Sequence, residues 1–359
     1  MNKRILFVIR SLTGGGAERV VSTLSNALVN RNYDIHIILY SKSNTDYYID
    51  DKVKIHYMPN RKNNIYGKIL RIFDIKKIIN SIKPDVIIPF VGTILYVSYI
   101  TSKQVKPKFI RTIRDSPWHE EGSVLDKIIR KHINKKCDAI MIQNEEQRLF
   151  FDKELNNKLF VVHNPISPEF IDSKKDDYSI RINNIISVGR LTYQKNHEML
   201  INAINDLKDK YPNLKVKIYG DGPNRDKLNE LVKSYNLIDR VLILKRTNDI
   251  KKELVNSDLF VMTSRYEGMP NALMEAMALG LPCISSDCKT GPKTLIANGK
   301  DGFLYNWDSL DDLKNVLVKV IDNSEEAAKI GNAARNKIIN NYCDKIIVEE
   351  FKEMLERIF

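Results

Sequence analysis

Apolar runs and amphipathic stretches alternate along the first 165 residues. The run RILFVI, at residues 4–9, is uniformly apolar after its first residue, as a strand buried on both faces of a parallel sheet requires. A glycine loop follows, and then a stretch with apolar residues at helical spacing, ERVVSTLSNALVNRN. Later runs repeat the alternation: YDIHIILY, DVIIPFVG, PKFIRTI and CDAIMIQN. The pattern predicts a doubly wound α/β domain over residues 1–165.

The alternation restarts in the second half. Residues 166–182 are mostly polar and lie beside two prolines, which predicts a linker. From residue 183 onward, helical stretches separate five further apolar runs: IISVGR, KVKIYG, RVLILK, LFVMTS and PCISSD. We expect a second α/β domain over residues 183–338, and an amphipathic helix within 339–359 that packs back on the first domain. Two such domains predict a cleft between them, with ligands at the carboxyl ends of the strands.

The composition is that of a soluble globular protein. The 359 residues exceed what one hydrophobic core usually serves, and 43% of them are hydrophobic and 28% charged. The chain has no run of about 18 apolar residues, which a membrane-spanning helix would need. Its start has too short an apolar core for a signal peptide. The cysteines fit neither a disulfide framework nor a zinc site. We therefore expect a protein of the reducing cytoplasm.

The positive charge is confined to the first half of the chain. Residues 1–166 hold 28 Lys and Arg against 16 Asp and Glu, whereas residues 167–359 hold 29 of each, so the first half carries the whole net charge of +12. We expect that half to meet an anionic partner, such as nucleic acid, a membrane surface or a phosphorylated substrate.

Cations and glycines follow several of the expected strands. In SVGRLTYQKN, Arg190 and Lys195 come shortly after a strand, where an arginine could bind two phosphate oxygens and a lysine could add a point charge, although solvated surface cations have the same pattern. YGDGPNRDKL resembles either a phosphate turn or an ordinary tight connection. TGGGAER would let the backbone approach a ligand, but it lacks the spacing of a dinucleotide site, so NAD is not expected.

Two acids lie eight positions apart in SRYEGMPNALMEAMALGLPCISSD. Glu267 falls in the turn after a strand, and Glu275 falls in the first turns of the following helix, for which Asn271 is a suitable N-cap. The amides from Gly268 to Leu273 gather at that helix start, which favours a phosphate, while carboxylates beside it favour hydroxyls. A nucleotide sugar, with a diphosphate between two polyols, combines these groups.

At this point the chain resembles glycosyltransferase family 4, which comprises retaining enzymes of the GT-B fold with two Rossmann-like domains. The resemblance rests on the Glu267 and Glu275 spacing and on further segments in the same order as in that family: GGGAE, VGRLTYQKN, GDGP and TGPKTLIANGKDGFLY. It covers nearly the whole chain and is strongest in the second half. The most similar members build bacterial capsular, O-antigen or lipid-linked oligosaccharides.

The resemblance implies a role for each matching residue. Arg190 and Lys195 would neutralise the donor diphosphate, Glu267 would hold hydroxyls of the donor sugar, and Glu275 would accept from the ribose. Other donor contacts would come from two glycines of the first domain, from residues after the strand VLILK, and from the turn before the helix: Gly15, Gly16, Arg246, Thr247, Gly268, Met269, Pro270 and Asn271. His119 resembles the histidine that relatives place near the acceptor hydroxyl, and would be catalytic with Glu267, Arg190 and Lys195; a surface-loop histidine is the alternative.

Two positions depart from the family pattern. Relatives carry a glycine where Lys245 or Arg246 stands, and many carry an acid where this chain has Thr294, to which we assign no role. No D-x-D motif follows a strand in the manner of metal-dependent transferases, so we expect neither a metal nor a cofactor. Fixed cations and a helix terminus could stabilise the charge that develops on the leaving phosphate.

Two basic stretches of the first half are amphipathic. RKNNIYGKILRIFDIKKIINSIK, at residues 61–83, places Ile65, Ile69, Ile72, Phe73 and Ile79 near one face, and DKIIRKHINKK follows at 126–136. Each stretch could lie on an anionic membrane, or be an ordinary helix with a solvated basic side. Peripheral contact at the inner face of the cell membrane therefore remains open beside a purely cytoplasmic location.

The sequence predicts a retaining, metal-independent transferase that moves a hexose or N-acetylhexosamine from a nucleotide sugar, with UDP expected, to a lipid-linked or polysaccharide glycan. One alternative is a sugar-nucleotide epimerase of the same two-domain build, but the six histidines form no cluster for elimination chemistry. Another is a non-catalytic nucleotide- or nucleic-acid-binding protein. It would need aromatics interleaved with cations, and here the tyrosines are scattered, so no nucleic-acid partner is expected.

Overall fold

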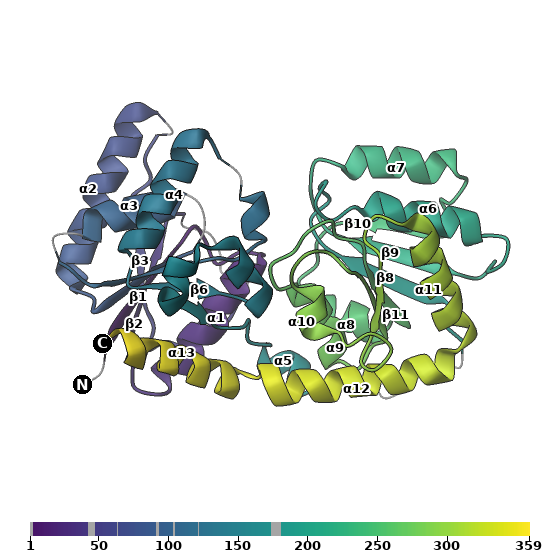
Figure 1. The fold of residues 1–359 in the computed structure, drawn as a ribbon. Helices are drawn as coiled ribbons and strands as arrows, with labels where there is room; N and C mark the ends of the chain where they lie inside the picture. The colour runs from purple at the N-terminus through teal and green to yellow at the C-terminus, as the bar shows by residue number, and fades with distance from the viewer. Residues whose placement is uncertain are drawn as a thin grey trace. The chain divides into compact units, whose positions relative to one another are not determined.

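The computed structural model divides into two compact units, one formed by Met1–Pro165 with Asp344–Phe359 and the other by Ile166–Cys343. Each unit is a parallel sheet with helices on its faces (Figure 1). The structure describes residues 3–41, 47–62, 64–90, 93–102, 105–120, 122–173 and 181–359.

The first unit contains a seven-stranded parallel sheet in the order β3-β2-β1-β4-β5-β6-β7. Its central strands are uniformly buried because helices cover both faces, which explains their unbroken apolar runs. The strands are β1 (Arg4–Ile9), β2 (Asp34–Leu39), β3 (Lys54–Tyr57), β4 (Val86–Pro89), β5 (Lys108–Thr112), β6 (Ala139–Ile142) and β7 (Leu159–Val161).

Helices cover both faces of the first sheet. One core cluster joins the sheet to apolar residues of α2, α3 and α4, and on the other side α1 packs against α13. The α-helices are α1 (Gly16–Val29), α2 (Ile65–Ile82), α3 (Thr93–Ser102), α4 (Val124–Lys136) and α13 (Asp344–Ile358). Three 3-10 helices complete the unit: η1 (Pro117–His119), η2 (Glu145–Phe150) and η3 (Lys153–Lys158).

The second unit contains a six-stranded parallel sheet in the order β10-β9-β8-β11-β12-β13. The strands are β8 (Asn184–Val188), β9 (Lys215–Tyr219), β10 (Val241–Leu244), β11 (Leu259–Met262), β12 (Cys283–Ser286) and β13 (Phe303–Tyr305). The helices are α5 (Pro168–Ile171), α6 (His197–Leu207), α7 (Arg225–Ser234), α8 (Ile250–Val255), α9 (Asn271–Ala278), α10 (Pro292–Leu295), α11 (Leu310–Asp322) and α12 (Ser324–Tyr342).

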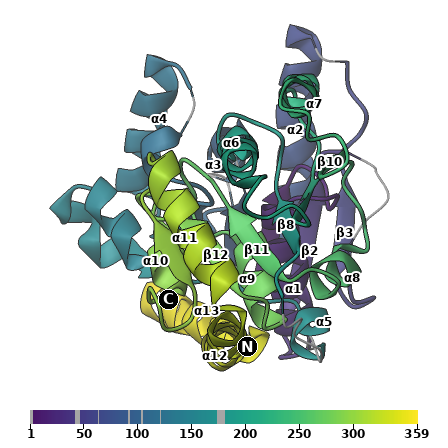
Figure 2. The same cartoon turned by 90° about the vertical axis from the view of Figure 1, so that its right-hand side faces the viewer.

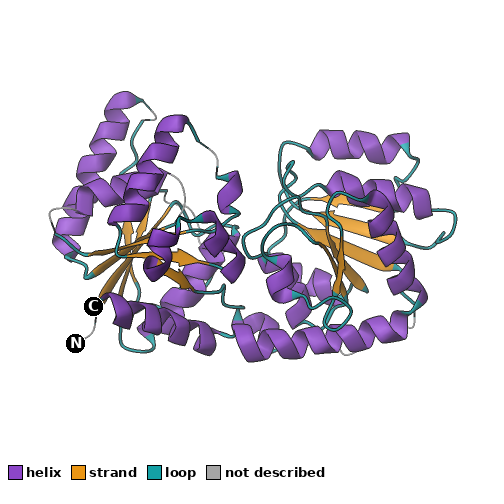
Figure 3. Cartoon of the chain, viewed as in Figure 1, coloured by secondary structure: helices purple, strands orange, loops and turns teal. Residues whose placement is uncertain are grey.

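Two groups of helices pack around the second sheet. Contacts join α6 to α7 and to α11, and α11 also packs on β12 and β13. Figure 2 shows α11 in front of β12. Another set of contacts joins α9 to α5, α12, β11 and β12. Figure 3 shows helices on both sides of each sheet, so the prediction of two doubly wound α/β folds is confirmed.

Each sheet reverses its strand order at one place. In the first unit the chain leaves β1 toward β2 and later returns to the other side at β4; in the second it leaves β8 toward β9 and returns at β11. Such switch points leave a crevice beyond the carboxyl ends of the two central strands, where ligands of doubly wound sheets bind. The residues that follow β8 and β11 are therefore the natural place to look for a site.

The segment between the two expected domains belongs to the second unit, and the segment after them is divided between the two units. Residues 166–182 were expected to be a linker; Ile166 donates its amide to the Tyr342 carbonyl and α5 packs on α9, while residues 174–180 lie outside the described residues. The expected division at residue 339 falls inside α12, and α13 is counted with the first unit. Arg335 of α12 fastens this region by donating to carbonyls of Ile171 and Ser173.

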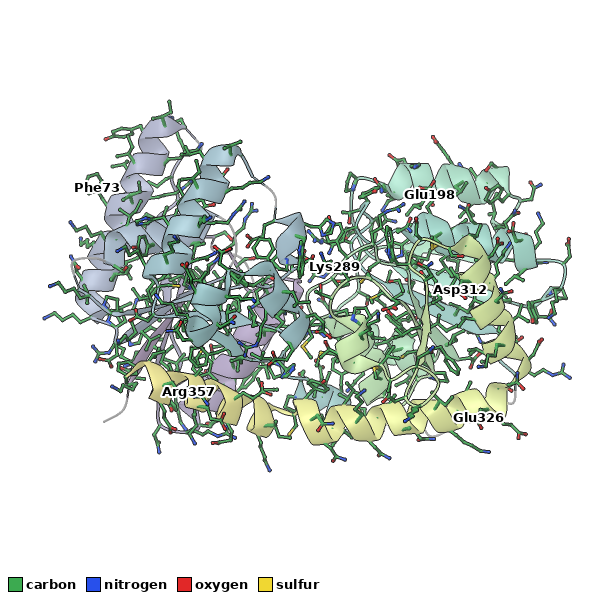
Figure 4. The ribbon with its side chains drawn as sticks, in the orientation of Figure 1. Phe73, Glu198, Lys289, Asp312, Glu326 and Arg357 are labelled. Atoms are coloured by element: carbon green, nitrogen blue, oxygen red, sulfur yellow. The ribbon has the colours of Figure 1, made fainter. Side chains whose placement is uncertain are left out.

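The amphipathic assignment of residues 61–83 needs a correction. The helix spans Ile65–Ile82, and its buried face is formed by Ile75, Ile79 and Ile82, so Ile79 belongs to the core and not to the outer face. Ile65, Ile69 and Phe73 are exposed, and Figure 4 labels Phe73 on the outer side of α2. The sheet covers only the second half of the helix, which the apolar spacing alone does not reveal.

Candidate active site

The loop after β8, which carries two of the expected cations, packs against the backbone of the connection after β9. Gly189 leaves room for the Lys195 side chain, since a Cβ at Gly189 would lie 3.2 Å from Lys195 Cγ. A Cβ at Gly220 would lie 1.8 Å from the Gly189 carbonyl oxygen, and Gly222, with φ of +159°, approaches the backbone of Leu191. The glycines of the GDGP segment therefore serve close packing of two loops, the ordinary alternative for that segment.

Lys195 and Glu267 form an ion pair between the loops that follow β8 and β11. Lys195 Nζ lies 2.5 Å from Glu267 Oε1, and the exposed fractions of the two side chains are only 18% and 7%. The Ser264 hydroxyl donates to the same carboxylate oxygen at 2.5 Å. Lys195 and the Ser264 hydroxyl therefore compensate the buried charge of Glu267, which lies at a polar site and not in an apolar core.

The other oxygen of Glu267 is left for a ligand. Among the described residues, no hydrogen bond joins a protein group to Glu267 Oε2, and this oxygen is not enclosed. The backbone at Glu267 is held by the Thr290 hydroxyl, which donates to its carbonyl. Gly291, with φ of +95°, packs so close that a Cβ there would lie 2.5 Å from the Gly268 carbonyl oxygen. The loop after β12 thus supports the turn that carries the acid.

Arg190 is linked to the same turn through a buried glutamine. Its Nη2 donates to Gln194 Oε1 at 2.9 Å, and Gln194 Nε2 donates to the Tyr266 carbonyl at 3.0 Å. Arg190 itself is exposed. Gln194 therefore orients a guanidinium that keeps most of its donors for a ligand, and it joins the Arg190 loop to the Glu267 turn.

A third cation at this edge was missed in the sequence. Arg265 donates to Asn196 Oδ1 at 2.8 Å, and its guanidinium lies 4.3 Å from the centre of the Tyr193 ring. Asn196, with φ of +49°, begins α6 in a left-handed conformation that asparagine tolerates better than most residues. The only sequence signal for Arg265 was its position shortly after the strand β11. A single arginine in a turn is as common on an ordinary surface as in a binding site.

The start of α9 differs by one residue from the prediction. Pro270 occupies the N-cap and Asn271 is the first helical residue, so the assignment of Asn271 as N-cap was wrong; proline suits the position because its missing amide is not needed there. Gly268, Met269 and Pro270 are buried in the turn before the helix. Glu275 lies in the second turn of α9 and is 4% exposed.

The remaining donor-binding candidates lie further away along the chain or in the first unit. Arg246 and Thr247 follow the edge strand β10, and Arg246 is exposed. Gly15 is the N-cap of α1 and Gly16 its first residue, and the Glu18 carboxylate covers Gly15, where a Cβ would lie 1.8 Å from Glu18 Oε2. A carboxylate therefore already sits at the helix start that was expected to meet phosphate.

His119 lies at the end of η1 in the first unit. It is exposed, and its Nδ1 lies 3.1 Å from the Ser116 hydroxyl oxygen. Ser116 follows β5 by a few residues, so His119 belongs to the carboxyl edge of the first sheet. This position is compatible with either a role at an acceptor or a surface-loop histidine.

Buried groups around the ion pair are held neutral. Burial, with the nearby charge of Lys195, lowers the pKa of His197 to about 4. Burial also raises the pKa of Cys288 to about 12, with a smaller contribution from the charge of Glu267. Neither group is therefore charged near neutral pH, and the formal charges of the site reside on Arg190, Lys195, Arg265 and the carboxylates.

The arrangement combines cations, helix-start amides and an acid with a free oxygen beside one switch point. Such a set can bind a phosphate and a hydroxylated group together. Within the described ranges, no group of three or more His, Cys, Asp or Glu side chains could hold a metal ion, and no helix is long and apolar enough to cross a membrane.

Family models match both units. The model for glycosyl transferases group 1 matches residues 173–337, and a glycosyl transferase 4-like model matches residues 8–144. The first covers the site built above, and the second covers most of the first sheet.

Relatives match over nearly the full length. The amylovoran biosynthesis glycosyltransferase AmsD of Erwinia amylovora is 26% identical, with 99% of this chain and 100% of the relative covered. An Escherichia coli protein named as a UDP-Gal:α-D-GlcNAc-diphosphoundecaprenol α-1,3-galactosyltransferase is 28% identical, with 94% and 93% covered. The Anabaena protein HepE, solved with UDP and glucose, has a similar fold, with a TM-score of 0.83, 18% identity and 99% of each chain covered.

Proposed function

The chain is a glycosyltransferase of the group 1 and 4-like families, and we propose that it transfers a hexose or N-acetylhexosamine from a UDP sugar to a lipid-linked or polysaccharide glycan, with retention at the anomeric carbon. The observation that carries the proposal is the Lys195–Glu267 pair beside the start of α9, because it brings a cation for phosphate and an acid for sugar hydroxyls together at a switch point.

In this proposal the second unit binds the donor. Arg190, oriented by Gln194, and Lys195 bind the diphosphate, and the amides at the start of α9 add partial positive charge. Glu267 Oε2 accepts from the donor sugar, and the turn from Gly268 to Asn271 lines it. Glu275 binds the ribose, while Arg246 and Thr247 contact the base from the end of β10.

The reaction breaks the bond between the anomeric carbon and the phosphate oxygen. Negative charge grows on the phosphate as the sugar becomes oxocarbenium-like. The acceptor hydroxyl attacks from the same face, bonds to the anomeric carbon and passes its proton to the departing phosphate oxygen. Fixed cations stabilise that charge without reorganising, so no metal is required in this scheme. His119 and the Gly15–Gly16 backbone belong to the proposal as acceptor-side and phosphate-side groups of the first unit.

The test is a donor panel that measures release of nucleoside diphosphate. UDP, GDP and ADP sugars are supplied with a membrane lipid extract as acceptor, with and without EDTA. We expect release from a UDP sugar that persists in EDTA and falls about 100-fold or more in Arg190→Gln, by analogy with loss of one fixed donor to an anionic transition state.

A matched control uses another cation of the second unit. The exposed Lys227 pairs with Glu198, which Figure 4 labels, so Lys227→Gln should keep wild-type release. Release that depends strictly on added metal, or that is equal in Arg190→Gln and wild type, would overturn the proposed mechanism.

We further propose that the first unit rests on the cytoplasmic face of an anionic membrane through the outer sides of α2 and α4. Six large apolar side chains there are 47–79% exposed: Ile65, Ile69, Phe73, Val124, Leu125 and Ile128. Exposed lysines accompany them: Lys62, Lys68, Lys76, Lys77, Lys127 and Lys131. Exposed apolar groups among cations are the pattern of an interfacial surface.

Two observations favour a membrane over a solvated helix face. Each of the two helices has a single acid, and Asp74 is paired with Arg61 while Asp126 caps α4, so neither offsets the lysines. Tyr96 of α3 donates to the Asp126 carbonyl, and α3 also packs on α2, so α3 lies between the two surfaces and joins them.

Vesicle binding tests this surface. Ile69→Glu with Phe73→Glu should weaken binding to phosphatidylglycerol vesicles at least 10-fold, while Leu149→Glu, at an 82% exposed apolar residue of the same unit, should not. Equal binding of all three proteins, or equal binding to neutral phosphatidylcholine vesicles, would contradict the proposal.

A further inference from the structure

Two arginines of the first unit, three positions apart, have opposite electrostatic surroundings. Arg111, on β5, is 1% exposed and donates to both carboxylate oxygens of Glu120 at 2.7 and 2.8 Å. Arg114, just beyond the end of β5, has no carboxylate partner among the described residues. The charge of Arg111 is therefore neutralised within the fold, and that of Arg114 is not.

The neighbours of Arg114 are neutral. Its Nη1 donates to Asn164 Oδ1 at 3.1 Å, its Nη2 lies 3.5 Å from the Met141 sulfur, and its guanidinium lies 4.6 Å from the centre of the Phe90 ring. Its Nε has no hydrogen-bond partner although it is enclosed. Burial lowers the pKa of Arg114 to about 9, so the side chain remains mostly protonated at neutral pH.

A second polar atom at this place is also unsatisfied. Gln143, 1% exposed after β6, donates through Nε2 to Asn164 Oδ1 at 2.9 Å, while its Oε1 has no partner. Asn164 follows β7 and accepts from both Arg114 and Gln143. The ends of β5, β6 and β7 thus gather one uncompensated cation, one unused N–H donor and one unused acceptor.

A structural role alone leaves this arrangement unexplained. A buried charge is normally paired, and buried polar atoms normally have hydrogen bonds, because both lose their hydration on folding. The Nε of Arg111 is also without a partner, but Glu120 balances the charge of Arg111, whereas no carboxylate of the described residues balances that of Arg114. An anion with an adjacent hydroxyl would satisfy Arg114 and Gln143 together, since the anion takes the N–H donors and the hydroxyl donates to Gln143 Oε1.

We propose that Arg114, oriented by Asn164, binds the phosphate that links the acceptor sugar to its lipid, and that Gln143 Oε1 accepts a hydrogen bond from a hydroxyl of that sugar. The inference rests on the proposed function, which assigns the donor phosphates to Arg190 and Lys195 of the second unit and thereby leaves the acceptor as the anion for the first. The chemistry required is a sugar or lipid phosphoester, and not a free nucleotide.

Binding of farnesyl diphosphate tests this site without a known acceptor. Trp118 lies four residues after Arg114 and packs edge-on against Phe150. The chain has two tryptophans, so a Trp307→Phe background makes Trp118 the sole tryptophan, which is excited selectively over the tyrosines at long wavelength. Farnesyl diphosphate, farnesol and inorganic pyrophosphate are titrated into the full chain with UDP present in excess, which occupies the donor site.

We expect farnesyl diphosphate to bind and farnesol not to. Arg114→Gln should weaken binding about 10- to 100-fold, as loss of a charged hydrogen-bond donor does. Arg114→Lys should restore part of it, because it keeps the charge. Arg148→Gln, which removes an arginine already paired with Glu145, should bind as the wild type does. UDP binding by each variant, together with the near-ultraviolet signal of Trp118, reports that both units are folded.

Three results would overturn the proposal: unchanged binding in Arg114→Gln, equal binding of farnesol, or displacement of farnesyl diphosphate by UDP. Pyrophosphate that binds as tightly as farnesyl diphosphate would overturn the lipid assignment, since the site would then take a free anion. The proposed function has a separate failure, because absence of nucleoside diphosphate release from every donor leaves farnesyl diphosphate binding unaffected.

Discussion

Replacing Glu267 by glutamine should separate donor binding from turnover. In the structure the acid and Lys195 hold each other at 2.5 Å, with little exposure of either side chain. At an effective dielectric constant of about 20, two charges at this separation attract by roughly 7 kcal/mol, although desolvation cancels most of that. Measured interaction free energies between contacting residues are about 0.5–3 kcal/mol, so we take about 1–2 kcal/mol as the net interaction free energy of Glu267 with Lys195.

Glu267→Gln removes the ion pair with Lys195. The Lys195 ammonium can then bind the diphosphate without first breaking its contact with a carboxylate, so UDP should bind about 5- to 30-fold more tightly, as about 1–2 kcal/mol implies. Turnover should fall by about 100-fold, because the sugar loses the acid that fixes its hydroxyls near the anomeric carbon. Lys195→Met should have the opposite effect on UDP and weaken its binding.

Calorimetric titration with UDP and initial rates of nucleoside diphosphate release measure the two effects. Glu198→Gln is the matched control, because Glu198 also pairs with a lysine of the second unit but stands on its exposed surface. The reasoning is refuted if Glu267→Gln binds UDP as weakly as Lys195→Met does, or if it turns over at the wild-type rate.

Three further predictions concern stability. The pKa of His197 is lowered from 6.5 to about 4 in the folded chain, so unfolding takes up a proton below pH 6.5. The free energy of unfolding should therefore have its full value above pH 6.5 and fall by up to about 1.4 kcal/mol per pH unit toward pH 4. In urea titrations, His197→Asn should lack this decrease at acid pH. Asn196→Ala should destabilise by about 1–3 kcal/mol, because alanine is strained at φ of +49° and cannot accept from Arg265, whereas Asn196→Gly should retain the backbone and cost less in the same measurement. Gly331→Val should lower the denaturation midpoint by an amount equivalent to about 2 kcal/mol or more, because a Cβ there would lie 2.3 Å from the Gly280 carbonyl oxygen, and Glu326→Ala on the exposed side of the same helix should not.

The strands and the ion-paired residues of the second unit were predictable because each leaves a local signal. Buried parallel strands need continuous apolar runs, and Lys195 and Glu267 lie in the loops that follow two of them, β8 and β11. The pairing of those two residues was not predictable, since it depends on β8 and β11 being neighbours in the sheet. Gln194 and Arg265 were missed for the same reason: their partners, Arg190, Tyr266 and Asn196, are brought together only by the strand order.

Other differences arise from tertiary context. The apolar spacing of α2 is helical, but which of its isoleucines are covered depends on where the sheet ends, and Ile79 is buried while Ile69 is not. The glycines at the start of α1 predicted an open helix terminus, and Glu18 folds back over Gly15 instead. Arg114 carried no signal at all, because a sequence does not show that an arginine lacks an acid.

The placement of α13 gives the two units an unequal order of completion during synthesis. Its buried residues, among them Ile347, Phe351 and Met354, supply part of the covering over α1, yet they follow the entire second unit in the chain. A ribosome therefore releases every residue of the second sheet before α13 can cover α1. The first unit, although translated first, therefore keeps apolar residues of α1 exposed until α13 has been translated.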